Sequence, residues 1–407
     1  MTKLSSIAYY VTEKISSNDI SLFKYVTTDC ILQNKKGREV ATNLPPQSCS
    51  LVRYQCGDVL IANIRPYLKK IWFADSEGGA SSDVLVFRAK EGHSPSFLYA
   101  VLLQDSFFDY VMQGAKGSKM PRGDKAQILR YEMPTLSSSE ENIGAFFLNL
   151  DYKIKLNEQI NQNLEAMAKQ LYDYWFVQFD FPNEDGKPYK SSGGEMVWNE
   201  KLRKDIPKSW EVKSLNSWLE IKSGFPFKSE TYKPLGRYKI ITIKNVQDGE
   251  LITSGCDYVD EIPSCAKNYI SLQIGDRLIS LTGNCGRLCT VCEENLLLNQ
   301  RVGILYCDTI YLEYFYNFLN SSEMRTVVDN LANGAAQANL SPVELCKTNC
   351  FIPPIDILLS YNRKANVIRK AIVQNMIEIS QLTKQRDELL PLLMNGQVSV
   401  NSDLSLD

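Results

Sequence analysis

Two segments of the chain carry seam residues at intervals that alternate between four and three positions. The first seam runs through Ile143, Phe147, Leu150, Ile154, Asn157, Asn161, Leu164, Ala168, Leu171 and Trp175. The second runs through Tyr361, Ala365, Ile368, Ile372, Asn375, Ile379, Leu382, Arg386, Leu389 and Leu393. This is a heptad pattern, and it predicts two long helices that each carry one mostly apolar seam. A helix from Glu140 to Phe176 would be about 55 Å long, which exceeds most single-domain cores.

The two seams are predicted to pair as an antiparallel coiled coil. If Trp175 faces Tyr361, then Asn161 falls opposite Asn375. A polar pair inside an apolar seam fixes the register of two helices at some cost in stability. The alternative is that each helix packs against its own neighbouring domain and that the asparagine match is accidental. The pairing depends on Ile154, Asn161, Leu164 and Leu171 in the first helix and on Ile368, Ile372, Asn375 and Leu382 in the second.

Strand-like patterns fill the region before each helix. Short β-branched and aromatic runs, broken by turn residues, occur in both regions. The second region repeats the first, because Gly57-Asp58-Val59-Leu60-Ile61 returns as Gly275-Asp276-Arg277-Leu278-Ile279. At the same offset, Val84-Leu85-Val86-Phe87 returns as Val302-Gly303-Ile304-Leu305-Tyr306. The pattern therefore predicts a tandem duplication of one domain followed by one helix.

The predicted fold class is α+β, with two tandem strand-rich domains separated by a long antiparallel two-helix coiled coil and related by a pseudo-two-fold internal duplication. The predicted boundaries are 1–139 for the first domain, 140–180 for the central helix, 181–209 for a linker, 210–355 for the second domain, 356–396 for the distal helix and 397–407 for a tail. Two heads held apart suit a two-fold or bipartite partner, of which DNA is the obvious example.

Composition sets limits on the class of protein. The chain has 407 residues and is 44% apolar, which is enough for two or three domains with substantial cores. It shows no membrane-spanning run and no N-terminal signal, so we expect a cytoplasmic protein without a membrane partner. Eleven unevenly spaced cysteines do not form a disulfide framework. The single histidine, His93, excludes nearly every histidine-based metal site or nucleophile.

One cysteine motif has to be weighed separately. Cys285, Cys289 and Cys292 have the spacing of the three-cysteine iron–sulfur motif of radical S-adenosylmethionine enzymes. The internal repeat places these positions over Tyr67, Ile71 and Ala74, so the duplicated fold does not need a cluster there. Small buried cysteines are common packing residues. We therefore expect no metal site.

A resemblance to a known family rests on the helices and the segments that follow them. The matching stretches are Leu150-Asp151-Tyr152-Lys153-Ile154-Lys155-Leu156-Asn157, Ile160-Asn161, Leu164-Glu165-Ala166-Met167-Ala168, Trp175-Phe176-Val177, Phe179-Asp180-Phe181, Ser192-Gly193-Gly194-Glu195-Met196, Ile206-Pro207-Lys208-Ser209-Trp210 and Arg386-Asp387-Glu388-Leu389-Leu390-Pro391-Leu392-Leu393. They resemble the specificity subunits of type I restriction-modification enzymes. The likeness covers essentially the whole chain, although the recognition domains match only in outline.

The resemblance implies a non-catalytic subunit that reads double-stranded DNA. Each target recognition domain would read one half of a bipartite asymmetric sequence, and the helical pair would set the gap. Two modification subunits that methylate adenine would dock on the helices, and restriction subunits that translocate and cut DNA would join them. S-adenosylmethionine, ATP and Mg are expected only on those partners. In agreement, the sequence has neither an Asn/Asp-Pro-Pro-Tyr/Phe methyltransferase tetrad nor a Walker A loop. The alternative is an interaction scaffold of the same fold, or an inactive or orphan subunit.

The net charge of −2 does not exclude a local basic face, so candidate DNA contacts are taken from loops rich in cations and hydrogen-bonding groups. In the first domain they are Arg65, Tyr67, Lys69 and Lys70, then Lys116, Lys119 and Arg122, then Lys35 and Lys36 with Arg38. In the second domain they are Thr282, Asn284 and Arg287, with Lys244, Asn245, Gln300, Arg301 and the polar loop from Gly334 to Asn339. Each loop could instead be a turn with a solvated cation. Trp175 and Phe176, with Tyr174, are expected to seat the helix end against a domain or a partner subunit rather than to stack on bases. Asp151 and Glu165 are expected to be surface or docking residues rather than an acid/base pair.

Overall fold

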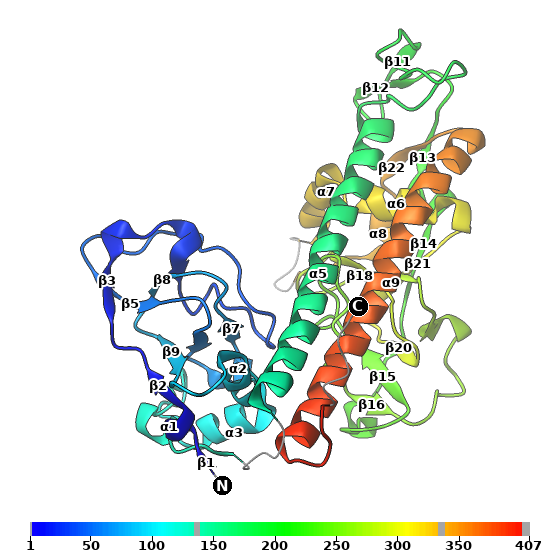
Figure 1. The fold of residues 1–407 in the computed structure, drawn as a ribbon. Helices are drawn as coiled ribbons and strands as arrows, with labels where there is room; N and C mark the ends of the chain where they lie inside the picture. Colours follow the sequence, from blue (N-terminus) through cyan, green and yellow to red (C-terminus); the bar gives the residue numbers. More distant parts are fainter. Residues whose placement is uncertain (1, 134–138, 333–337, 401–407) are drawn as a thin grey trace. The chain divides into compact units, whose positions relative to one another are not determined.

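The computed structural model describes residues 2–133, 139–332 and 338–400, which form two compact units. The first unit comprises Met1–Leu156 and Ile379–Asp407, and the second comprises Asn157–Glu378. Each unit therefore holds one strand-rich domain and a length of both long helices. These helices are α5 (Glu140–Tyr172) and α9 (Ile355–Met394), as the two heptad seams predict (Figure 1).

The first unit builds two four-stranded sheets and four short helices. Its strands are β1 (Thr2–Lys3), β2 (Ala8–Tyr10), β3 (Lys14–Ser16), β4 (Tyr25–Val26), β5 (Ser50–Tyr54), β6 (Val59–Ala62), β7 (Ile71–Phe73), β8 (Gly78–Ala80), β9 (Val84–Ala89) and β10 (Glu132–Met133). Its short helices are α1 (Leu4–Ile7), α2 (Pro95–Leu103), α3 (Asp105–Gln113) and α4 (Lys125–Ile128). The sheets have the orders β2-β9-β6-β7 and β3-β5-β8-β4.

The second unit also builds two four-stranded sheets, in the orders β14-β21-β18-β19 and β16-β15-β20-β17. Its strands are β11 (Met196–Asn199), β12 (Lys204–Pro207), β13 (Glu211–Ser214), β14 (Glu220–Ser223), β15 (Tyr238–Ile241), β16 (Tyr258–Val259), β17 (Ser271–Leu272), β18 (Arg277–Ser280), β19 (Leu288–Thr290), β20 (Leu296–Leu298), β21 (Val302–Tyr306) and β22 (Asn349–Ile352). Its short helices are α6 (Thr309–Leu319), α7 (Ser322–Ala332) and α8 (Pro342–Cys346). The hairpin of β11 and β12 lies within the predicted linker.

The two domains share the topology of one whole sheet and of three strands in the other, which confirms the predicted duplication. All pairs in the sheets β2-β9-β6-β7 and β14-β21-β18-β19 are antiparallel. In the other two sheets, β8 and β20 each lie between one parallel neighbour, β4 or β15, and one antiparallel neighbour, β5 or β17. The copies differ in the outer strand, since β3 extends the sheet beside β5 whereas β16 extends it beside β15.

The repeated Gly-Asp motif is a structural turn that begins β6 and β18. Gly57 and Gly275 have φ angles of 89° and 96°, a region that glycine enters without a Cβ clash. Asp58 accepts a hydrogen bond from the backbone N–H of Gln55 at 2.8 Å, and Asp276 accepts the equivalent bond from Gln273 at 2.8 Å. The recurring sequence therefore encodes a recurring backbone conformation.

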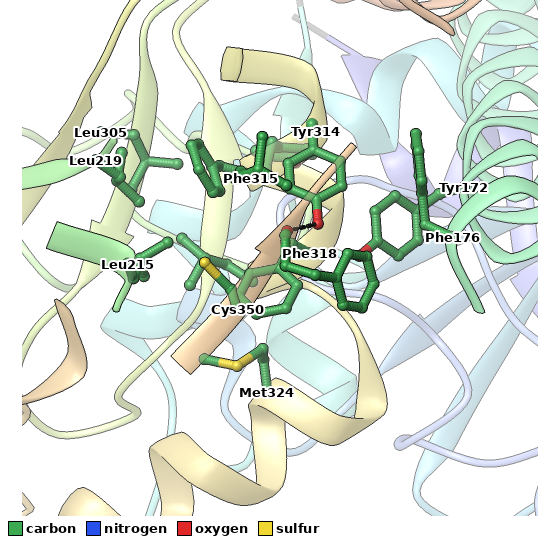
Figure 2. Packing of buried hydrophobic residues seen from close by; sticks show 14 of the residues in the cluster. Tyr172, Phe176, Leu215, Leu219, Leu305, Tyr314, Phe315, Phe318, Met324 and Cys350 are labelled. Atoms are coloured by element: carbon green, nitrogen blue, oxygen red, sulfur yellow. Dashed lines mark hydrogen bonds between the residues drawn. The ribbon is translucent and has the colours of Figure 1, made fainter. Parts of the chain in front are cut away.

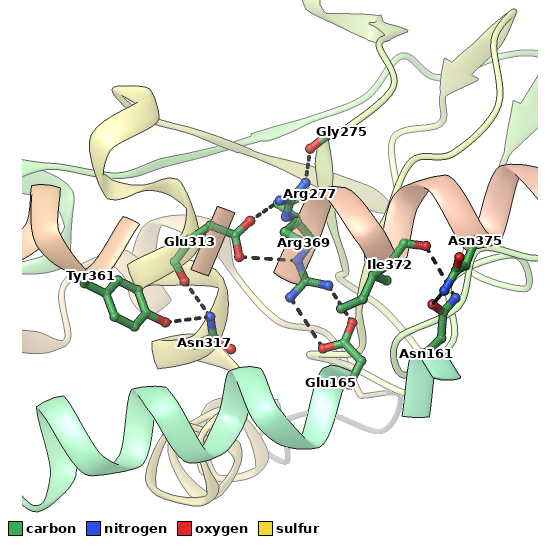
Figure 3. A network of polar contacts seen from close by, with 10 residues as sticks. All are labelled: Asn161, Glu165, Gly275, Arg277, Glu313, Asn317, Tyr361, Arg369, Ile372 and Asn375. Atoms are coloured by element: carbon green, nitrogen blue, oxygen red, sulfur yellow. Dashed lines mark hydrogen bonds and ion pairs between the residues drawn. The ribbon is translucent and has the colours of Figure 1, made fainter. Parts of the chain in front are cut away.

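The long helices pair in the predicted antiparallel register. In the second unit, the Trp175 and Tyr361 ring centroids lie 5.8 Å apart, and the Asn375 amide donates to Asn161 Oδ1 at 3.0 Å (Figure 3). In the first unit, residues of both helices share one core, namely Ile143, Phe147, Leu390, Leu393 and Met394. The prediction of paired seams is confirmed, and the alternative of an accidental asparagine match is wrong.

The end of α5 enters the core of the second domain. The helix continues through a π-helical turn from Asp173 to Val177, which buries Trp175 and Phe176. The Phe176 ring lies 5.0 Å from that of Tyr314 and 5.9 Å from that of Trp210. Figure 2 shows Tyr172 and Phe176 turned toward Tyr314 and Phe318. These aromatic residues are packing residues, as predicted.

The asparagine pair leads to a testable difference between single and double substitutions. Replacing Asn375 alone by leucine removes one amide and is expected to lower the free energy of unfolding by about 1 kcal/mol, because Asn161 loses a partner. Replacing both asparagines by leucine is expected to recover that loss, since no amide then remains in the seam. Thermal unfolding of the three proteins checks this order. Equal melting temperatures for the single and double variants would contradict it.

Candidate nucleic-acid interface

The two leading candidate loops of the first domain lie side by side. Ile64 forms a β-bridge with Arg122, and the Arg65 backbone N–H donates to the Pro121 carbonyl at 2.8 Å. The Gly123 N–H donates to the Asn63 carbonyl at 3.3 Å. We call residues 64–70 and 116–122 together the first loop pair.

The second domain builds the same arrangement. Thr282 forms a β-bridge with Asn339, the Gly283 N–H donates to the Ala338 carbonyl at 3.1 Å, and the Leu340 N–H donates to the Leu281 carbonyl at 2.7 Å. We call residues 282–287 and 338–340 the second loop pair. The remainder of the predicted polar loop, residues 334–337, lies outside the described residues.

Both loop pairs are anchored to equivalent strands by equivalent backbone bonds. The Asn63 N–H donates to the Asp83 carbonyl at 2.8 Å, just before β9. The Leu281 N–H donates to the Arg301 carbonyl at 3.0 Å, just before β21. The duplicated fold therefore presents one loop pair in each domain at the same structural position.

The first loop pair has an unusual backbone around its leading cation. Arg65 and Lys69 have φ angles of 54° and 50°, and they flank the 3-10 turn Pro66–Leu68. Positive φ is uncommon for residues with a Cβ and is tolerated only where the surrounding structure enforces it. Arg65 is exposed, and no described residue accepts a hydrogen bond from its guanidinium. Tyr67 is 50% exposed beside it.

The other cations of the first loop pair differ in whether a carboxylate or carbonyl of the protein already binds them. Lys119 is exposed and, like Arg65, has no partner among the described residues. Lys116 lies 3.3 Å from Asp124, and Arg122 lies 3.2 Å from Asp83, although both cations remain exposed. Lys69 pairs with Asp105 at 2.9 Å, and Lys70 donates to the Thr28 carbonyl at 2.6 Å. Arg65 and Lys119 are thus the cations most open to a ligand.

The third candidate group of the first domain is largely structural. The Lys35 side chain is only 5% exposed and pairs with Asp105 at 2.8 Å and Asp387 at 3.2 Å. Burial alone would raise the pKa of Asp105, but Lys35 and Lys69 hold it below its ordinary value. The prediction that Lys35 contacts DNA is therefore corrected, since its charge is already compensated inside the protein. Arg38 lies over the Trp72 ring at 4.2 Å, and Lys36 is exposed.

In the second domain, the predicted DNA contact Asn245 is a buried structural residue. Asn245 is 6% exposed, accepts from the Thr242 N–H at 2.8 Å and donates to the Ile252 carbonyl at 2.8 Å. It closes an internal turn, so its assignment to DNA is corrected. Arg287 is half-buried and donates to Gln247, and Thr282 is half-buried. The exposed candidates are Lys244, Asn284, Gln300 and Arg301.

The two surfaces differ in charge at one equivalent position. Arg301 of the second domain occupies the place of Asp83 in the first, because each carbonyl accepts the same anchoring bond. Asp83 compensates Arg122, whereas Arg301 is exposed and no described side chain compensates it. The duplicated scaffold therefore carries two chemically different surfaces.

Asp151 and Glu165 are predicted to be surface or docking residues rather than an acid/base pair. Both carboxylates are in fact only part-exposed, and each pairs with an arginine of α9. Asp151 Oδ1 lies 2.9 Å from Arg386 Nη1 in the first unit, and Glu165 Oε1 lies 2.5 Å from Arg369 Nη1 in the second (Figure 3). Two signals could have indicated buried charge. Arg386 occupies a seam position, and Arg277 stands where the first domain has an apolar residue.

The cysteine motif packs into the core. Cys289 is fully buried on β19 opposite Leu278, and burial raises the pKa of its thiol and raises that of Cys292 to about 11. Such burial disfavours the thiolate that a metal needs. Trp72 pairs with Leu60 as Cys289 pairs with Leu278, so Trp72 is the true counterpart, one residue from the predicted one. Among the described residues, no group of three potential ligands could hold a metal ion.

No described helix is both long and apolar enough to cross a membrane. No protein-family model matches the chain. The specificity subunit of the type I restriction enzyme MjaIX from Methanocaldococcus jannaschii is 23% identical over 404 residues, which cover 95% of this chain and 86% of that protein. The specificity subunit of the type I restriction enzyme HindI from Haemophilus influenzae is 23% identical over 454 residues, covering 97% and 98%.

Among solved structures, the S subunit of a type I restriction-modification system from M. genitalium has a TM-score of 0.57 and 14% identity, covering 97% of this chain and 95% of that one. This likeness concerns the fold, while the sequence relatives concern the family. The resemblance that the sequence indicates is therefore confirmed, and the chain is a homologue of type I restriction enzyme specificity subunits that shares the fold of a solved S subunit.

Proposed function

We propose that this chain is the DNA-specificity subunit of a type I restriction-modification complex, in which each domain binds one half of a bipartite target through its loop pair. The observation that carries the proposal is the repeated loop pair, anchored by equivalent backbone bonds in both domains. An exposed cation lies within the first loop pair, Arg65, and another, Arg301, lies at the strand that anchors the second. Cations bind phosphates and guanine edges, and the neighbouring amides and hydroxyls supply further donors.

The different chemistry of the two surfaces supports an asymmetric target. Asp83 in one domain and Arg301 in the other occupy the same anchoring position beside the loop pairs, so the two surfaces carry opposite charges there. Two identical half-sites would not suit both surfaces equally, because specificity depends on complementarity as much as on attraction. The paired helices would set the gap between the half-sites.

The helices would also dock two modification subunits. In the first unit α5 exposes Tyr152 and Leu156, which are 68% and 42% exposed, and in the second it exposes Met167, which is 52% exposed. Exposed apolar side chains repeated along one element suit a protein partner. Restriction subunits would join the same complex. The methyl donor S-adenosylmethionine, ATP and Mg would be bound by those partners, and this chain would contribute recognition without catalysis.

Methylation mapping tests the proposal. Genomic DNA from cells that make this chain with its modification partner is expected to show a two-part adenine-methylated motif. Arg65→Ala and Arg301→Ala are each expected to weaken or relax recognition of one half only, by about 1–3 kcal/mol if the guanidinium contacts a base. Loss of a phosphate contact would instead weaken binding uniformly and reduce its salt dependence.

Two matched controls remove a positive charge elsewhere in each unit. Arg130 is exposed beside Lys3 and Tyr110, and Lys208 is exposed and paired with Glu195. Arg130→Ala and Lys208→Ala are expected to leave the motif unchanged. An intact motif in both loop variants would remove the loop pairs from the interface. Absence of any bipartite motif, with the modification partner bound, would favour the scaffold instead.

A further inference from the structure

In each unit a buried arginine of α9 pairs with a part-buried carboxylate of α5, and both of these ion pairs have the same polarity. In the first unit Asp151 of α5 binds Arg386 of α9, with side-chain exposures of 16% and 5%. In the second unit Glu165 of α5 binds Arg369 of α9, with exposures of 30% and 5%. In both cases α5 supplies the carboxylate and α9 supplies the guanidinium.

Neighbouring side chains hold the charged groups of both ion pairs in position. The Tyr99 hydroxyl donates to Asp151 at 2.5 Å. Arg369 Nε also lies 3.3 Å from Glu313, whose carboxylate binds Arg277 as well (Figure 3). Burial alone would lower the pKa of Arg386 and Arg369, but the neighbouring carboxylates, with Tyr316 beside Arg369, keep both guanidinium groups charged. A like-charged partner at either position would therefore be strongly unfavourable.

The internal duplication aligns α5 with α9 residue by residue, so the contacts in a pair of two identical helices can be worked out. The seams align Leu150 with Ile368 and Leu164 with Leu382. Asp151 of α5 consequently occupies the position that Arg369 occupies in α9. Two helices with related seams could pair in the same register, so the charges decide which pairs are tolerated.

Homotypic pairing in this register would place like charges opposite each other. In this structure Glu165 of α5 faces Arg369 of α9, and Asp151 is the residue of α5 that aligns with Arg369. In a pair of two α5 helices, Glu165 of one copy would therefore face Asp151 of the other. In a pair of two α9 helices, Arg386 would face Arg369. The asparagines would not disfavour a pair of two α5 helices, since Asn161 of one copy would face Asn157 of the other.

We propose that the shared polarity of the two ion pairs makes each half of this chain pair only with the other half and excludes pairs of identical halves. The partner of the seam on α5 is thus the seam on α9 and no second copy of α5. The molecule consequently carries one copy of each strand-rich domain. This property concerns assembly, and it holds whether or not the loop pairs bind DNA.

The test uses the full chain with a protease site in an exposed turn between the two halves, where a cut disturbs no core packing. The tip at Asp185 and Gly186 is exposed, so a protease site can be inserted there with Gly186 kept, because Gly186 has a φ angle of 73° that favours glycine. Two preparations with different tags on the N-terminal half are cut, mixed, unfolded and refolded together. Capture by one tag then shows which halves have paired. We expect the captured half to hold the C-terminal half in at least about tenfold excess over the other tagged half.

Charge reversal provides the decisive variants. Asp151→Arg gives α5 a cation opposite Glu165 of a second α5 and a cation opposite Arg386 of α9. Pairs of identical N-terminal halves are therefore expected to become the major product. Adding Arg386→Asp to the same chain restores an ion pair between unlike halves. The new aspartate would also face Arg369 of a second α9, and the new arginine still faces Glu165 of a second α5, so charge then favours neither kind of pair and both like and unlike halves are expected in the captured product.

Two results would overturn the proposal. One is equal capture of like and unlike halves by the unmodified chain, and the other is unlike pairing that is unchanged in Asp151→Arg. A second measurement needs no refolding of cut chains. Thermal unfolding of the intact protein should show that Asp151→Arg lowers the melting temperature and that adding Arg386→Asp recovers part of the loss. Additive losses would show that the pair carries no selective charge interaction.

Discussion

Replacing Arg369 by methionine is expected to lower the free energy of unfolding by about 3–5 kcal/mol, the cost of breaking a buried ion pair from one side. Arg369 is 4% exposed and binds both Glu165 and Glu313. Without it, Glu313, itself 3% exposed, retains only Arg277 as a charged partner. The methionine fills similar space, so the loss reports on the unpaired carboxylates. A fall of roughly 6–20 °C in melting temperature corresponds to this range for a unit of this size.

Arg363 offers a matched control on the same helix. It is exposed, and its replacement by methionine is expected to change the free energy of unfolding by no more than about 0.5 kcal/mol. Hydrogen exchange at α6 should rise in the Arg369 variant and stay unchanged in the Arg363 variant, because Glu313 lies in α6. Equal melting temperatures for the two variants would show that the network contributes little to stability.

Replacing Phe176 by alanine is expected to cost about 3–5 kcal/mol, the usual range for deleting a buried aromatic side chain. Phe176 is 1% exposed, and its ring lies 4.8 Å from Tyr361 and 5.0 Å from Tyr314. It therefore joins the end of α5 to α9 and α6 in one aromatic cluster. Figure 2 shows Phe176 beside Tyr172 and Tyr314 of this cluster. Near-ultraviolet circular dichroism should lose intensity as the cluster loosens, and the thermal transition of the protein should move down.

The neighbouring Val177 serves as the control for Phe176. It is 56% exposed in the same π-helical turn, so Val177→Ala is expected to stay within about 0.5 kcal/mol of the original protein. If both substitutions cost equally little, the end of α5 would not be held by its aromatic residues.

The long helices and their register followed from the sequence because heptad spacing is a local property. Side chains at alternating steps of four and three lie on one face of a helix whatever surrounds it. The first face carries two asparagines and the second carries one. The register that sets Trp175 opposite Tyr361 brings Asn161 opposite Asn375, and Asn161 does bind Asn375. The duplication was equally visible, since the Gly-Asp turn depends on residues that are adjacent in the chain.

The sequence did not show which of the candidate cations are exposed and free to bind a ligand. Lys35 and Arg65 are both basic residues in polar loops, yet Lys35 is buried between Asp105 and Asp387 while Arg65 is exposed. Asp387 lies in α9, far away in the chain. No local pattern reports a partner that arrives from so distant a segment. The same reason hid the roles of Asp151 and Glu165.

By itself, the sequence determined the two helices, their antiparallel pairing, the duplicated strand-rich domains and the family resemblance, because each rests on spacing or similarity along the chain. Only the tertiary structure decided which loops lie together, which cations remain open and which charges join the helices. Those features depend on contacts between distant segments, such as Ile64 with Arg122 and Asp151 with Arg386. Burial then sets whether a charge is compensated within the protein or left exposed for a ligand.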